Sequence, residues 1–158
     1  MARPLRVHVP NGVYHVIQCA TDHEVLFADT TDHEEFDKLL ELTVRRCDWR
    51  PHLVCHMTTH VHFVLQSTEP LARGMQFLMS QYVQEFNLRH KRRGTLVQSR
   101  YWAELIETEE RYERCLAYVA LNPVTAGLCR RPEDWPWTRL FGRSFGHSGQ
   151  VASGHDGV

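Results

Sequence analysis

The sequence lacks any apolar run near the roughly 20 residues that cross a bilayer, and its first residues lack the charged-then-apolar pattern of a secretory signal. It carries little net charge, −1 at pH 7, so its overall charge does not indicate a generic nucleic-acid binder. Its five cysteines are odd in number and include no CxxC pair, which favours reduced, mostly buried thiols over a disulfide framework. We therefore expect a cytoplasmic protein that is not associated with a membrane.

The chain also shows no internal repeat and no interdomain linker. A length of 158 residues favours one compact domain with a core of its own. Residues 146–158 are rich in Gly, Ser and His, a composition typical of disorder. We predict a single domain over 1–145 and a disordered tail over 146–158.

Hydrophobic periodicity predicts alternating strands and helices. Period-2 patterns indicate strands at 12–20, 49–57, 60–66 and 101–106, and 3.6-residue patterns indicate helices at 31–47, 70–92 and 108–121. Strand, helix, strand, strand, helix, strand is the split βαβ order. The fold class expected is α+β and ferredoxin-like: a four-stranded antiparallel sheet with two helices on one face and an added C-terminal helix. Trp135-Pro136-Trp137 is expected to press back on this domain as an aromatic clamp.

The triplet His60-Val61-His62 lies on the third predicted strand. Residues i and i+2 of a strand point to one face, with Cα atoms roughly 6–7 Å apart. The two imidazoles are thus placed to converge on one divalent ion, while Val61 faces the helices. Two polar side chains on a solvated sheet face are the alternative interpretation.

The turn before this triplet decides which other histidines lie near it. A two-residue turn at Thr58-Thr59 pairs His62 with Cys55 and places His56 beside Val61. We therefore exclude His52 and His56 from the metal site, although a three-residue loop would reverse that parity.

Tyr118 and Asn122 are four residues apart and share a face if the third helix reaches both. A tyrosine hydroxyl is a candidate nucleophile, and an amide oxygen is a candidate ligand for a hard cation. Pro123 predicts that the helix kinks or restarts at Asn122. An equal alternative is that Asn122 is the N-cap of a short new helix with Pro123 at its first position. A half-buried aromatic and a helix cap are the structural alternatives for the two residues.

Positive charge gathers at the end of the second predicted helix and just after it. The candidates for phosphate contacts are Arg89, Lys91, Arg92, Arg93 and Arg100. A solvated helix end explains the charge run equally well. Tyr82 is the competing nucleophile, but its place on the apolar stripe of the second helix favours a core position.

The ordered motifs of the chain resemble those of the REP-associated tyrosine transposases, a group within the HUH single-tyrosine transposases of insertion sequences. The resemblance runs from about Gly12 to Gly142, and each motif matters less than their order. The motifs are HVHFVL at 60–65, RGMQ at 73–76, YVQEFNLRH at 82–90, YVALNPVTAG at 118–127 and WPW at 135–137.

This resemblance implies a ferredoxin-like fold and a DNA transposase that nicks single-stranded DNA near a hairpin and transfers the strand. By position, His60 and His62 match the HUH pair, Tyr118 the nucleophile that forms a 5′-phosphotyrosine, and Asn122 the third metal-binding residue. The implied cofactor is Mg²⁺ or Mn²⁺. The implied partner is single-stranded DNA bearing a REP-like hairpin, bound by a nucleoid-associated monomer or homodimer.

Two other functions compete with this one. A non-catalytic nucleic-acid-binding module would keep the fold and the basic segment without forming a covalent bond to DNA. A metallonuclease would use water as the nucleophile, with zinc on the histidines, and would turn over without a protein–DNA adduct.

Overall fold

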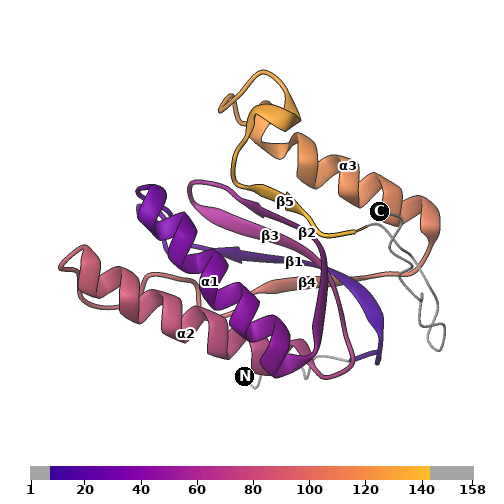
Figure 1. Cartoon of the computed structure of the whole chain (residues 1–158), viewed down its shortest axis with the longest axis horizontal. Coiled ribbons are helices and arrows are strands. Elements are labelled where there is room, and N and C mark those ends of the chain that lie inside the picture. The colour runs from indigo at the N-terminus through magenta and orange to yellow at the C-terminus, as the bar shows by residue number, and fades with distance from the viewer. Residues whose placement is uncertain (1–7, 143–158) are drawn as a thin grey trace, which may run out of the picture.

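The computed structural model describes residues 8–142 of the chain (Figure 1). Its elements, in chain order, are β1 (Gly12–Cys19), α1 (Thr30–Cys47), β2 (Trp49–His56), β3 (His60–Ser67), α2 (Leu71–Arg89), β4 (Trp102–Ile106), α3 (Glu109–Thr125), the 3-10 helix η1 (Pro132–Asp134) and β5 (Thr138–Leu140). The tail predicted over 146–158 falls outside the described residues, so that prediction stays open. No helix of the described part is long and apolar enough to span a bilayer.

The strands form one sheet in the order β4-β1-β3-β2-β5, and every neighbouring pair is antiparallel. The first four strands have the order of a split βαβ unit, so the predicted α+β, ferredoxin-like fold is confirmed. The fifth strand was not predicted. It is only three residues long and pairs with the edge of β2, and a segment this short carries no readable alternation.

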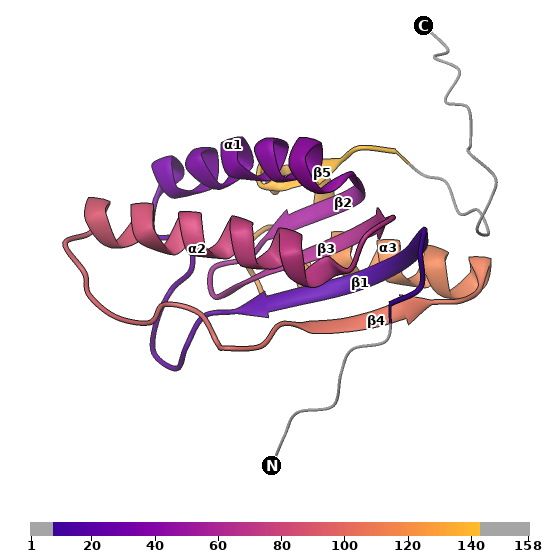
Figure 2. The ribbon, with the colours of Figure 1, turned by 90° about the horizontal axis from the view of Figure 1, so that it is seen from below.

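The sheet separates two apolar clusters because alternate strand residues point to opposite faces. On one face, Val16, Val61 and Phe63 pack with side chains of α1 and α2. In Figure 2 these two helices lie side by side on the same side of the sheet. On the other face, Cys55 and Val64 pack with Leu116 and Val119 of α3, among others. The added helix therefore covers the face that α1 and α2 leave open.

Helix α2 lies close to the sheet at Gly74. A Cβ atom added there would lie 2.3 Å from the ring of Trp49, a side chain only 2 % exposed. Helix α1 ends at Cys47, its C-cap Asp48 has a left-handed conformation, and Trp49 directly begins β2. The glycine in the RGMQ motif is thus required by close packing of helix and strand.

The structure corrects two expectations about local geometry. Helix α3 does not break at Asn122 but continues through Pro123 to Thr125. Pro123 is buried, so packing of this turn against the sheet outweighs the missing N–H of the proline. Unbroken alternation along β2 would place His52 on the same face as His56. The register of β2 shifts between Pro51 and Leu53, and this bulge turns His52 to the α3 face instead.

The aromatic segment after η1 fastens the chain to the edge of β2. The indole N–H of Trp135 donates to the carbonyl of His56 at 2.8 Å, and the amide of His56 donates to the carbonyl of Trp137 at 3.0 Å. The ring of Trp137 stacks on His33 with centroids 4.0 Å apart. The predicted aromatic clamp is confirmed, and β5 continues directly from it.

Candidate functional site

The HxH pair is on β3, the central strand, between β1 and β2. His62 pairs with Cys55, and His56 lies opposite Val61, as the two-residue turn predicts. The Met57 amide closes that turn by donating to the His60 carbonyl at 2.8 Å. His56 packs with Phe27 and Phe36 on the α1–α2 face, so its exclusion from the site is consistent with the structure.

The Thr58-Thr59 turn is held by contacts from outside the hairpin. The carbonyl of Thr58 accepts from the Leu26 amide at 2.9 Å, and the carbonyl of Thr59 accepts from the Ala20 amide at 2.8 Å. Neither threonine has a positive φ, the torsion that a tight type I′ turn demands of both central residues. The loop after β1 therefore stabilises the Thr58-Thr59 turn, whose own two residues do not favour this geometry.

His62 is the centre of a hydrogen-bonded set of side chains. Its Nδ1 lies 2.9 Å from Nε2 of His15 on β1, and its Nε2 lies 3.3 Å from Nδ2 of Asn122 on α3. One tautomer satisfies both contacts: Nδ1–H donates to His15, and Nε2 accepts from the Asn122 amide. His62 is 1 % exposed, so this side chain is held by its partners rather than by water.

Burial keeps these imidazoles neutral. Loss of hydration lowers the pKa of His15 to about 4. The same loss, reinforced by the neighbouring His15 and His60, lowers the pKa of His62 to about 3. Burial also lowers the pKa of His60. Neutral imidazoles offer the lone pair that a metal ion needs, so the site favours ligation over protonation at neutral pH.

His60 lies at the open end of the site. Its ring is 4.9 Å from that of His62, centroid to centroid, at an interplanar angle of 72°, and its Nδ1 is 3.2 Å from the Thr59 hydroxyl. The two rings therefore come from one strand face and lie next to each other, as the i, i+2 spacing predicts. His52 also faces α3, but its Nδ1 contacts the Tyr112 hydroxyl at 2.7 Å instead.

Tyr118 is beside these histidines and open to solvent. Its ring centroid lies 6.0 Å from that of His62 and 6.1 Å from that of His15, and the residue is 56 % exposed. Because α3 continues through Asn122, Tyr118 and Asn122 stand one helical turn apart on the same face. The helix thus brings a phenol and an amide to the histidines of β3 together.

The set of donors fits a divalent cation. Two neutral imidazoles and one amide bring no charge of their own, and imidazole nitrogen suits Mn²⁺ better than Mg²⁺. The amide oxygen and nitrogen of Asn122 exchange places by a rotation about χ2, which would present the oxygen to an ion bound at His62 Nε2. The residues present fit a divalent cation, and His60, His62 and Asn122 are the ones that could hold it.

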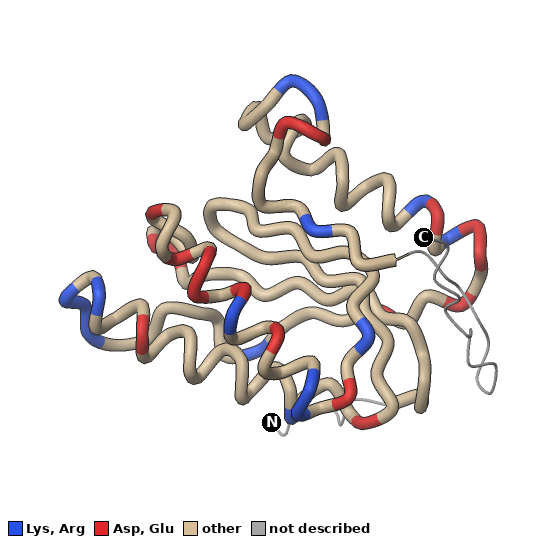
Figure 3. The backbone as a smooth tube through the Cα atoms, in the orientation of Figure 1, with Lys and Arg blue, Asp and Glu red and all other residues tan. Residues whose placement is uncertain are grey.

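The predicted phosphate contacts have different environments. Figure 3 shows lysine and arginine gathered at the C-terminal end of α2. There, Arg89 donates to Asp32 at 2.8 Å, and Arg92 forms an ion pair with Glu24 at 3.0 Å and donates to the Thr95 carbonyl at 2.7 Å. Both guanidinium groups are thus engaged in the fold. Lys91 and Arg93 are exposed, and Arg100 is half-buried.

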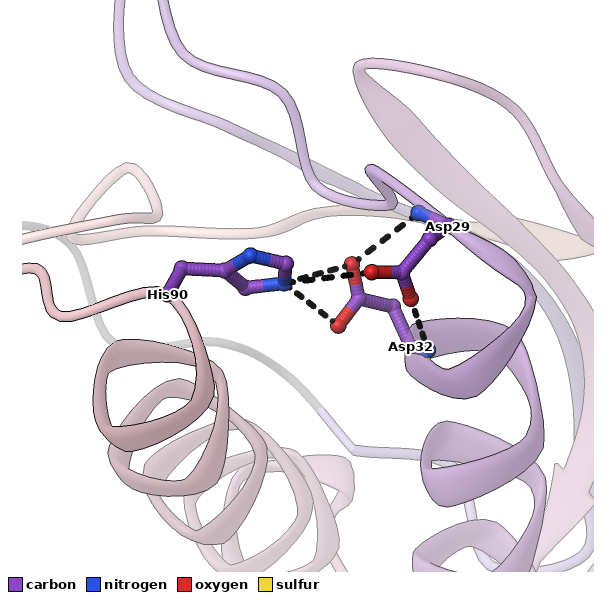
Figure 4. Close-up of side chains that lie close together, drawn as sticks. All are labelled: Asp29, Asp32 and His90. Carbon is purple, nitrogen blue, oxygen red and sulfur yellow. Dashed lines mark hydrogen bonds and ion pairs between the residues drawn. The ribbon is translucent and has the colours of Figure 1, made fainter.

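A second group of metal-ligating residue types lies far from β3 in sequence. Ligand atoms of Asp29, Asp32 and His90 come within 4.8 Å of one another (Figure 4). The Asp32 carboxylate is fully buried and accepts from the Ala28 amide, Asp29, His90 and Arg89. It also completes the capping box of α1. Because the Asp32 oxygens already accept hydrogen bonds and a guanidinium group lies 2.8 Å away, we interpret this cluster as an ion-paired contact that holds α1 against α2.

Tyr82 is placed in the core, as its position on the apolar stripe predicts. It is 0 % exposed, and its hydroxyl donates to the Leu26 carbonyl. Burial raises the pKa of this phenol well above its ordinary value. Tyr82 therefore has neither the access nor the ionisation that a nucleophile needs.

His15 is the site residue that sequence reasoning missed. It lies in the first strand, 47 positions before its partner His62. Its only sequence signal is a polar residue inside an apolar strand, in Val13 to Ile17. The contact follows from the order of strands, which places β1 beside β3.

The comparisons with known proteins give a likeness in structure but not in sequence. No protein-family model matches the chain, and no curated protein matches it. A solved structure of a REP-associated tyrosine transposase bound to a REP hairpin superposes with a TM-score of 0.76 at 16 % identity, over 87 % of this chain and 82 % of that one. The resemblance read from the motif order is thus confirmed at the level of structure: this chain has the fold of a REP-associated tyrosine transposase.

Proposed function

We propose that this protein is a metal-dependent transposase that nicks single-stranded DNA and transfers the strand through a covalent 5′-phosphotyrosine on Tyr118. The observation that carries the proposal is the meeting of three residues, two from α3 and one from β3. An exposed phenol from α3 lies about 6 Å, ring to ring, from the buried His62 of β3, which Asn122 of the same helix contacts at 3.3 Å. Packing of α3 on the sheet does not by itself require that the Tyr118 phenol and the Asn122 amide both lie beside a buried histidine.

In the proposed reaction, the Tyr118 oxygen attacks the scissile phosphorus in line and the phenolic proton passes to solvent. A bond forms between that oxygen and phosphorus, and the bond from phosphorus to the 3′ oxygen breaks. The leaving 3′ oxygen takes up a proton from solvent, so the products are a 5′-phosphotyrosine and a free 3′-hydroxyl. His60, His62 and Asn122 would hold a Mg²⁺ or Mn²⁺ ion, which would offset the negative charge on the phosphate oxygens.

The covalent bond favours transfer over hydrolysis. Phosphodiester and phosphotyrosine linkages have the same number of ester bonds, so a second 3′-hydroxyl can displace Tyr118 without a nucleotide cofactor. His15 supports the site: its Nε2 accepts from Nδ1–H of His62, so Nε2 of His62 is left as the atom that would bind a metal ion.

We infer that the substrate is single-stranded DNA with a hairpin. The similar transposase is bound to a REP hairpin, and its fold covers most of this chain. Exposed Lys91 and Arg93 supply phosphate contacts from the end of α2, with Arg100 nearer the sheet. The protein acts on this DNA as a monomer or homodimer.

The experiment incubates the protein with hairpin-bearing single strands and Mn²⁺ and maps any adduct by peptide mass. We expect a nucleotide mass on Tyr118, lost in Tyr118→Phe, while the affinity for DNA stays within about twofold. Tyr14→Phe is the matched control, because it removes a buried phenolic hydroxyl that accepts from the Val9 amide outside the site.

The rival functions give different results in the same assay. DNA binding without cleavage indicates a nucleic-acid-binding module. Repeated cleavage with no adduct, in both the parent and the Tyr118→Phe variant, indicates a metallonuclease that uses water. An adduct that persists in Tyr118→Phe rejects the assignment of the nucleophile.

A further inference from the structure

A cavity of about 540 Å³ opens beside Tyr118, on the side of the sheet edge. Its floor comes from β1 and β4, where Ile17 pairs with Trp102 and His15 with Glu104. Its wall is one face of α3, where Arg111, Arg114, Cys115 and Tyr118 follow the i, i+3, i+4, i+7 spacing. The cavity therefore shares two residues, His15 and Tyr118, with the proposed catalytic site.

Trp102 gives this cavity an unusual floor. A tryptophan side chain is highly buried on average, yet Trp102 is 47 % exposed on the edge strand of the sheet. Its ring stands edge-on to His15, with centroids 5.2 Å apart and planes at 84°. The contact fixes the indole against a buried side chain while leaving apolar ring surface open to the cavity.

The rim of the cavity is charged. Arg111 lies 3.9 Å from Glu104, and Arg114 lies 2.6 Å from Glu110. Both arginine side chains are more than half exposed, so neither ion pair removes the cation from solvent. A flat apolar surface beneath two solvated guanidinium groups matches the chemistry of a nucleotide, with a base that stacks and a phosphate that carries negative charge.

We propose that this cavity holds the unpaired base of a nucleotide that adjoins the scissile phosphate, stacked on Trp102, with Arg111 and Arg114 at its backbone. This inference rests on the proposed function, because that function places the phosphate at Tyr118. The cavity opens directly beside Tyr118, so a strand joined to that phosphate can pass along its wall and floor. Stacking on an aromatic ring tolerates any base, so the cavity positions the strand for in-line attack and does not read its sequence.

The remaining cavity residues fit this role. Cys115 lines the wall, and burial beside Glu104 raises the pKa of its thiol to about 11, so it stays protonated and unreactive next to the DNA. Ile17 and Ile106 add apolar surface below the base. The cavity thus has an apolar interior and a charged rim.

The test uses Tyr118→Phe protein, which cannot cleave, and hairpin-bearing single strands with 2-aminopurine placed in turn at each position flanking the cleavage junction. We expect strong quenching of 2-aminopurine at one position next to the junction. Trp102→Ala should abolish the quenching and weaken binding by about tenfold, whereas Trp102→Phe, which keeps an aromatic ring, should retain both. Leu140→Ala is the control, because Leu140 is 63 % exposed on β5, at the opposite edge of the sheet.

The outcomes separate this inference from the function on which it rests. Quenching and affinity that are the same with Trp102→Ala as with Leu140→Ala overturn the cavity assignment. If the parent protein still forms its covalent adduct, the proposed function stands in that case. A parent protein that binds no such strand overturns both. Circular dichroism of Trp102→Ala is the folding control: a spectrum like that of the parent excludes unfolding as the cause of lost quenching.

Discussion

Replacing His15 by phenylalanine should weaken divalent-metal binding without removing a metal ligand. In the native protein, Nδ1–H of His62 donates to Nε2 of His15 at 2.9 Å, in a place where His62 is 1 % exposed. Phenylalanine keeps a flat ring in the strand but cannot accept this hydrogen bond. The change in metal affinity depends on how much the lost hydrogen bond costs in the metal-free protein and in the metal-bound protein.

The metal-free protein can avoid leaving the Nδ1–H of His62 without an acceptor. With Nε2 unligated, His62 can move its proton from Nδ1 to Nε2 and donate to a rotated Asn122 amide. With a metal ion on Nε2, the proton has to stay on Nδ1, where it faces phenylalanine. A buried donor without a partner costs about 1–3 kcal/mol. The bound state leaves a buried N–H donor unpaired, whereas the metal-free state leaves only a buried acceptor, Nδ1, unpaired. The affinity should therefore fall, toward the lower end of the roughly 10- to 100-fold range found for partners of metal-ligating histidines.

Titration with Mn²⁺, followed by the paramagnetic resonance of the free ion, measures this change directly. The matched variant is His15→Gln, whose amide reaches about as far as Nε2 and restores an acceptor, so most of the affinity should return. Nitrogen chemical shifts of His62 report its tautomer in each variant. Equal Mn²⁺ affinity in the parent and His15→Phe proteins would refute the orienting role of His15, and no Mn²⁺ binding by the parent would refute the metal site itself.

Two further predictions concern stability. Burial lowers the pKa of His15 and His33 to about 4 and of His62 to about 3, so below the ordinary value of 6.5 the unfolded chain takes up protons that the folded chain refuses. The free energy of unfolding should therefore fall as the pH drops from about 6.5 to 4, by up to ~1.4 kcal/mol per pH unit for each histidine. Urea titrations across this range measure the slope, and a flat profile would contradict it. Gly74→Ala should lower the free energy of unfolding by about 1–3 kcal/mol, because the new methyl group meets the Trp49 ring at 2.3 Å and the helix gains only about 1 kcal/mol from alanine; an unchanged or higher urea midpoint would argue against tight packing there.

Charge patterns were the least informative part of the sequence. Five basic residues between Arg89 and Arg100 were predicted to contact phosphate. In the structure, Arg89 pairs with Asp32 and Arg92 with Glu24, and both acidic partners lie more than fifty positions away in the chain. Charge alone does not tell a residue that binds DNA from one that ties two helices together, because long-range pairing decides which cations remain exposed.

The sequence by itself determined the features that depend on neighbours along the chain. Alternation and parity placed His60 and His62 on one strand face, with His56 on the other, because successive strand residues point to opposite sides. The spacing of four placed Tyr118 and Asn122 on one helix face. The apolar stripe of α2 placed Tyr82 in the core.

Only the tertiary structure decided the features that depend on which segments become neighbours. Strand order brings His15 to His62, and packing carries α3 through Pro123 so that the phenol and the amide reach the same histidine. The bulge in β2 and the short β5 likewise depend on partners across the sheet. The physical reason is that propensities and periodicity act over a few residues, whereas burial acts on whatever surfaces the fold brings into contact.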